Sequence, residues 1–78
     1  MTKDEALQWI ANLFEEPAGK VTPETAKKEI GAWDSLGVLS LMAGLDEKFG
    51  ILISEDDLQQ FRKVGDIIEF LERAGKIS

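Results

Sequence analysis

The sequence predicts an all-α fold, a small bundle of three main helices and one short helix, in a single domain that spans residues 1–78. Apolar residues recur at three- and four-residue intervals in three separate segments, as they do on the buried face of an amphipathic helix. Helix-capping side chains precede most of these segments. No alternating pattern supports a sheet, because the apolar stretch 51–53 is too short to build one alone.

The first helix begins with a T-x-x-E capping box formed by Thr2 and Glu5. We expect it to end near Glu15 or Glu16, because Pro17 and a following glycine interrupt the pattern. The apolar positions that follow helical spacing are Leu7, Ile10, Ala11 and Phe14. A long polar connection then leads to residue 33, and a Thr-Pro pair at 22–23 within it would start one short helical turn.

The second helix is expected over residues 36–49, with Gly50 as its terminator. Asp34 is a good N-cap, which leaves Ser35 at the first helical position and facing outward. An anion such as a phosphate on Ser35 would suit the positive end of the helix. The broad apolar face comprises Val38, Leu41, Met42, Leu45 and Phe49, and Leu36, Leu39 and Ala43 extend it to one side.

The remaining chain predicts a brief third helix and a longer fourth helix. Ser54 and Asp57 form the cap of the third helix, which should run through Leu58 and Phe61. The fourth helix follows residues 64–71, and Gly75 is available to end it. Because Lys63 is a poor N-cap, we expect the start of this last helix to fray.

Composition narrows the possible functions. The chain contains no cysteine and no histidine, which removes thiolate or imidazole metal ligands and the usual nucleophile–base pairs. Its net charge of −6 argues against nucleic acid or an anionic membrane as a partner and for basic protein surfaces. No apolar run approaches the length of a membrane span. We therefore expect a cytoplasmic monomer without a metal site.

The chain resembles the acyl and peptidyl carrier protein family over nearly its whole length. The resemblance includes the Asp34, Ser35, Leu36 motif, the long first connection, "FGILISEDDL" (residues 49–58) and "VGDIIEFL" (residues 64–71). It implies that a phosphopantetheinyl transferase moves 4'-phosphopantetheine from coenzyme A onto Ser35. It also implies that Asp34 helps to hold the metal ion of that reaction, that Leu36 contacts the transferase, and that Trp33 anchors the loop.

The family resemblance further implies a carrier that catalyses nothing itself. Acyl groups would be bound as thioesters to the arm and presented to acyl-loading and acyl-processing enzymes with basic docking patches. A specialised fatty-acid, polyketide or ligase-loaded pathway is favoured, because the second helix lacks the outer row of acids usual in fatty-acid carriers. The alternatives are a discrete aminoacyl or peptidyl carrier and an unmodified acidic helical adaptor, in which Asp34 and Ser35 only cap a helix.

Two surfaces are predicted around Ser35. A smooth groove between Gly37 and Gly44, beside an exposed Val38, would let a partner backbone approach closely, although drift on a solvated face explains the glycines equally well. The predicted docking residues are Trp33, Gly37, Val38, Ser40, Gly44, Asp46, Glu47, Glu55 and Asp56.

An apolar cargo could also enter a yielding cavity between the helices, where methionine repacks easily. The residues expected to line this cavity are Leu39, Met42, Ile53, Phe61 and Ile67, for which an ordinary core position is the alternative.

Overall fold

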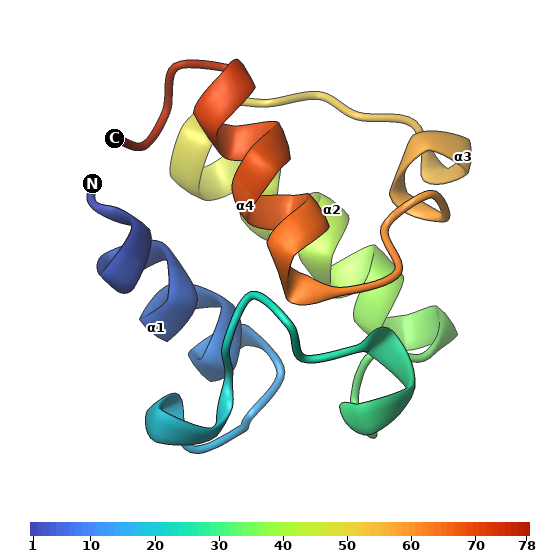
Figure 1. Ribbon diagram of the computed structural model, residues 1–78. Helices are drawn as coiled ribbons and strands as arrows, with labels where there is room; N and C mark the ends of the chain where they lie inside the picture. Colours follow the sequence, from blue (N-terminus) through green and yellow to red (C-terminus); the bar gives the residue numbers. More distant parts are fainter.

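The computed structural model describes residues 1–78 and confirms the predicted all-α fold. Its α-helices are α1 (Lys3–Leu13), α2 (Ser35–Phe49), α3 (Glu55–Leu58) and α4 (Val64–Arg73). Two single-turn 3₁₀ helices lie in the connection between α1 and α2 (Figure 1), and they are η1 (Ala18–Lys20) and η2 (Lys27–Glu29). Extended pairing is limited to one isolated antiparallel bridge between Ala26 and Lys63. None of the helices is long and apolar enough to cross a membrane.

The capping box of α1 is present as predicted. The Thr2 hydroxyl accepts a hydrogen bond from the Glu5 backbone N–H (3.2 Å), and the Glu5 carboxylate accepts one from the Thr2 backbone N–H (2.8 Å). The hydrogen bond from the Thr2 backbone N–H, together with the Thr2 side chain, favours the ionised carboxyl and lowers the pKa of Glu5. The predicted end of the helix near Glu15 or Glu16 was wrong, because Phe14 already leaves helical geometry and Glu15 adopts a left-handed φ of 57°.

The connection between α1 and α2 differs from the prediction in one detail. Residues 22–25 form a turn, closed by a hydrogen bond from Thr25 N to Thr22 O (3.0 Å), and not a helical turn. The single helical turns of this connection lie on either side of it, in η1 and η2. The connection is therefore more structured than its polar sequence suggests.

Both ends of the short third helix follow from local chemistry. The Ser54 hydroxyl accepts a hydrogen bond from Asp57 N (3.1 Å), which confirms the predicted cap. The helix ends at Leu58, so Phe61 lies beyond it and the predicted extension was wrong. Gly50 ends α2 as predicted, with a left-handed φ of 67° and a hydrogen bond from its N–H to Asp46 O.

The first turn of α4 is held by a distant part of the chain. Lys63 makes no side-chain cap, as its residue type predicts. Instead, Val64 N donates to Thr25 O (2.9 Å) and Gly65 N donates to Pro23 O (2.8 Å). Because the α1–α2 connection satisfies these N–H groups, the structure gives no support to the expected fraying.

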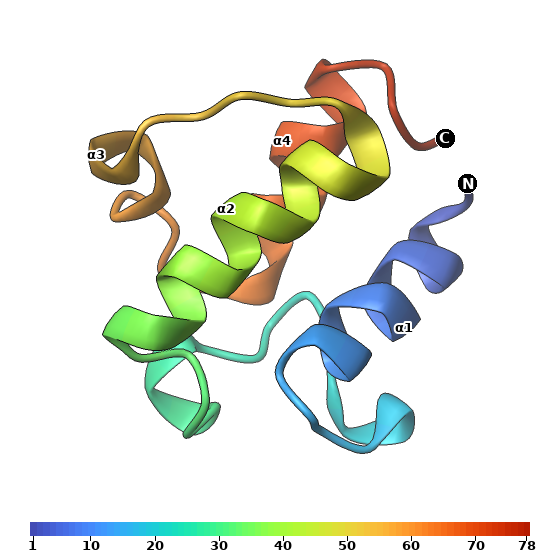
Figure 2. The ribbon, with the colours of Figure 1, turned by 180° about the vertical axis from the view of Figure 1, so that it is seen from behind.

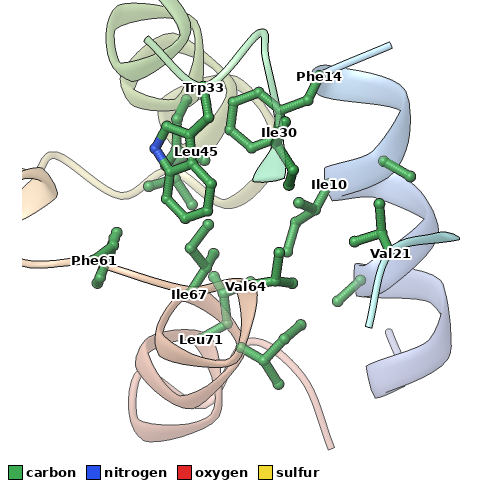
Figure 3. Packing of buried hydrophobic residues seen from close by; sticks show 14 of the residues in the cluster. Ile10, Phe14, Val21, Ile30, Trp33, Leu45, Phe61, Val64, Ile67 and Leu71 are labelled. Carbon is green, nitrogen blue, oxygen red and sulfur yellow. The ribbon is translucent and has the colours of Figure 1, made fainter. Parts of the chain in front are cut away.

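The core is entirely apolar, since no polar or charged residue is buried. Helix α1 packs against both α2 and α4, and α3 packs against α2. Figure 3 shows side chains from α1, α4 and the α1–α2 connection meeting at the centre, among them Ile10, Phe14, Ile30, Trp33, Val64 and Ile67. The two chain ends lie together (Figure 1), where Ser78 N donates a hydrogen bond to Met1 O (3.1 Å).

Candidate functional site

Ser35 is the first residue of α2 and is exposed, as the sequence predicts. The preceding Asp34 caps the helix. Its carboxylate Oδ1 accepts a hydrogen bond from Gly37 N (3.0 Å), and its carbonyl oxygen accepts one from Val38 N (2.9 Å). The cap fixes the point at which the helix begins and thus the direction in which Ser35 leaves it.

The surroundings of Ser35 suit an attached phosphate. The backbone N–H groups of Ser35 and Leu36 have no acceptor within the protein, and the Ser35 hydroxyl makes no hydrogen bond. The positive end of a 15-residue helix also favours an anion at this point. No histidine exists to activate the hydroxyl.

Trp33 fixes the loop that leads to Ser35. Its side chain is only 3% exposed, its ring stacks on that of Phe14, and its backbone N–H donates to Ile30 O (3.0 Å). This burial makes the prediction of Trp33 as a docking residue for a partner protein wrong, because the ring is covered except where it borders the cleft described below. Figure 3 shows the indole among the core side chains.

The predicted groove between Gly37 and Gly44 does not exist as a partner surface. Gly37 and Val38 are buried. A Cβ on Gly37 would lie 2.0 Å from the carbonyl oxygen of Ala32, so this glycine allows the preceding loop to pass against the helix.

Gly44 faces the protein's own first helix. A Cβ there would lie 3.0 Å from the Trp9 ring of α1 and 3.2 Å from the Leu13 side chain. The sequence spacing already indicated this internal packing, because positions 37, 41 and 44 fall on one helix face. Residue 41 belongs to the predicted core. The two glycines therefore serve internal packing, and the docking prediction for Gly37, Val38 and Gly44 was wrong.

The other predicted docking residues are exposed. They are Ser40, Asp46 and Glu47 on α2 and Glu55 and Asp56 in the first turn of α3. Leu36 is 73% exposed and Leu39 50% exposed, so the outer side of α2 presents apolar as well as acidic groups. Docking at these positions stays a prediction.

The five residues predicted to line one cavity lie in three different parts of the structure. Leu39, Met42 and Ile53 line a groove of about 270 Å³ between α2 and the segment 51–53. Ile67 is completely buried in the core, as the alternative interpretation held. Phe61 lines a different and larger cleft, described below, which the sequence did not predict.

Comparison with known proteins decides the family. A family model described as "Phosphopantetheine attachment site" matches residues 6–71. The acyl carrier protein of Helicobacter pylori strain G27 is 39% identical over 64 residues, which cover 81% of each chain. This chain belongs to the acyl carrier protein family. The meromycolate extension acyl carrier protein of Mycobacterium tuberculosis strain H37Rv is 29% identical over 94% of this carrier and 67% of its own length.

A solved structure supports the same assignment. The holo acyl carrier protein of Geobacter metallireducens matches this acyl carrier protein with a TM-score of 0.73 and 30% identity, covering 94% of this chain and 85% of the other. The chain is therefore a carrier with covalently bound phosphopantetheine and not a catalyst. Membership also implies interaction with a phosphopantetheinyl transferase and with acyl-processing enzymes.

Proposed function

We propose that Ser35 is the residue to which 4'-phosphopantetheine is attached. The observation that carries this assignment is an exposed hydroxyl, free of internal hydrogen bonds, beside two free N–H groups at the start of α2. Those N–H groups would face the phosphate of the arm. When bound, the arm supplies a terminal thiol that carries acyl groups as thioesters.

The neighbouring residues would position Ser35 for the transferase. Asp34 holds the helix start through its bond to Gly37 N, and it retains a second carboxylate oxygen for a metal ion brought by the transferase. Leu36 offers an exposed apolar side chain next to the serine. Because Trp33 is buried in the core, it would hold the loop in place while the transferase binds.

For the cargo, we propose acyl groups of a specialised fatty-acid, polyketide or ligase-loaded pathway. The support lies on the outer side of α2, where Asp46 and Glu47 are the only acids and Leu36 and Leu39 are exposed. A partner for this face would combine a small basic patch with an apolar contact. One relative carries the name "Meromycolate extension acyl carrier protein".

Intact mass spectrometry tests the attachment site. The apo protein is incubated with coenzyme A, Mg²⁺ and a broad-specificity phosphopantetheinyl transferase, which releases adenosine 3',5'-bisphosphate as the arm is transferred. The unchanged protein should gain one arm and Ser35→Ala none. Ser40→Ala is the matched control, because Ser40 is also an exposed serine of α2, and it should gain the arm fully.

The same experiment separates the alternatives. A protein that stays unmodified with several competent transferases would be an acidic adaptor rather than a carrier. If the arm is gained, charging of the modified protein by acyl-activating or by aminoacyl-activating ligases distinguishes an acyl carrier from an aminoacyl or peptidyl carrier.

A further inference from the structure

A cleft of about 790 Å³ lies beside the α1–α2 connection, within the usual ~300–1,000 Å³ of small-molecule sites. One wall comes from residues 26–33 and the other from the α3–α4 linker, residues 59–62. Its lining combines cations with apolar and aromatic groups, namely Lys27, Lys28, Arg62, Ile30, Phe61 and Trp33.

The charge of this cleft opposes that of the molecule. The protein has a net charge of −6, yet Lys27, Lys28 and Arg62 come together here. Neither ion pair of the structure involves them, since those pairs are elsewhere, on α1 and α4. Three cations without carboxylate partners create a local preference for an anion.

Two carboxylates on the segments that carry these cations form no ion pair with them. Glu29 accepts a hydrogen bond from Ala26 N (2.6 Å), and Asp66 accepts one from Arg62 N (2.9 Å). Both carboxylates thus accept hydrogen bonds from backbone N–H groups, and neither residue lines the cleft.

The indole N–H of Trp33 provides a second, independent sign of a ligand. Its Nε1 is buried and has no hydrogen-bond partner, although the ring lines the cleft. Figure 3 shows this nitrogen on the side of the ring away from Phe14 and toward Phe61. A buried donor without an acceptor destabilises a fold by roughly 1–3 kcal/mol. An acceptor that entered the cleft and reached this covered nitrogen would remove that penalty.

We infer that this cleft binds the carboxylate end of an acyl group tethered to Ser35, which rests on the proposed attachment site. Trp33 and Ser35 are two residues apart, so their Cα atoms are at most ~7.6 Å apart and the flexible arm extends beyond that separation. Lys28 and Arg62 would pair with the carboxylate while the indole N–H donates to it. Ile30 and Phe61 would contact the methylene groups. A purely apolar chain would offer neither a charge to the cations nor an acceptor to the indole N–H.

A matched pair of cargoes tests this site. The protein is loaded from succinyl-coenzyme A or from butyryl-coenzyme A, which give arms of equal chain length that differ in the terminal carboxylate. The readout is the indole N–H resonance of Trp33 in ¹⁵N-labelled protein. Trp9, which packs edge-on against Phe49 and lies outside the cleft, is the internal reference. We expect the Trp33 resonance to move downfield with the succinyl arm, and the Trp9 resonance to stay in place.

Variants assign the effect to the cleft. Lys28→Gln combined with Arg62→Gln should abolish the succinyl-dependent shift of Trp33. Lys63→Gln is the matched control, because Lys63 is exposed and adjacent to Arg62 but does not line the cleft, and it should retain the shift. Equal Trp33 shifts for succinyl and butyryl arms, or no shift with either, would overturn the inference.

Loading is verified by mass before each spectrum, which separates the two claims. Absence of an arm on Ser35 would contradict the attachment site and leave the cleft to be judged with untethered thioesters. For that measurement, succinyl-pantetheine and butyryl-pantetheine are titrated into Ser35→Ala. A Trp33 shift specific to the succinyl compound supports the cleft, and its absence at saturating concentration overturns it.

Discussion

The indole ring of Trp33 stacks on the phenyl ring of Phe14, with ring centroids 5.1 Å apart and ring planes 18° from parallel. Trp33 lies two residues before Ser35, whereas Phe14 follows the last residue of α1. The stack therefore joins the end of the first helix to the loop that presents the serine. Offset aromatic pairs of this kind contribute about 0.5–1.5 kcal/mol beyond the area that they bury.

Removing one ring of this stack should weaken the whole fold. We expect Phe14→Ala to lower the free energy of unfolding by about 3–5 kcal/mol, because Phe14 is 1% exposed and its loss leaves a cavity under Trp33. Urea denaturation followed by circular dichroism measures this change. Leu52→Ala is the control, since Leu52 is 87% exposed and should alter stability by less than about 0.5 kcal/mol.

Gly37→Ala should destabilise the protein although alanine is the better helix former by about 1 kcal/mol. The added Cβ would meet the Ala32 carbonyl oxygen, and such overpacking typically costs ~1–3 kcal/mol. The prediction is a lower Tm in a thermal melt. Gly31→Ala adds a Cβ with no neighbour within 4 Å and should leave the Tm unchanged or slightly raised. Equal Tm values for the two variants would contradict the close approach of Ala32 to α2.

Substitutions of Asp34 separate its cap from its charge. Asp34→Ala should lose about 0.5–2 kcal/mol of stability, because Gly37 N loses its acceptor. Asp34→Asn keeps an acceptor oxygen and should fold within a few tenths of a kcal/mol of the unchanged protein, on the order expected for N-cap exchange. If the carboxylate charge holds the transferase's metal ion, Asp34→Asn should gain the phosphopantetheine arm more slowly. Equal rates of arm transfer to the variant and to the unchanged protein, measured by time-resolved mass spectrometry, would show that Asp34 acts only as a helix cap.

The capping box of α1 should make stability sensitive to acid. Hydrogen bonds from Thr2 lower the pKa of Glu5 in the folded state below its ordinary value of 4.5. The carboxylate thus stabilises the fold above that value, and the contribution disappears as the pH falls through the lowered folded-state pKa. Glu5→Gln retains the acceptor but does not titrate, so its loss of stability between about pH 5 and pH 3 should be shallower. Parallel curves of unfolding free energy against pH would show that this linkage is absent.

Local chemistry made much of this molecule predictable. Thr2, Asp34, Ser54 and Gly50 each cap a helix within a few residues of their own position, and the chain alone contains that information. The lengths of α1 and α3 were overestimated because apolar residues such as Phe14 and Phe61 continue the helical spacing while the backbone has already turned. Spacing shows which residues are buried and not where hydrogen bonding stops.

Features built from distant segments could not be predicted in the same way. The start of α4 lacks a side-chain cap, and its N–H groups find acceptors at Pro23 and Thr25 only when the chain is folded. The basic cleft likewise combines Lys27 and Lys28 with Arg62, which α2 and α3 separate in the sequence. Each of these residues by itself predicts only a solvated charge.

The hydrogen bond between Ser78 and Met1 has a practical consequence for studying transfer reactions. Figures 1 and 2 place both termini at the opposite end of the molecule from the first turn of α2. A resin, a fluorophore or a fused enzyme attached to either end would therefore leave the phosphopantetheine arm free to reach the partner enzymes. Single-molecule tethering through the amino or the carboxyl end should report the same exchange kinetics.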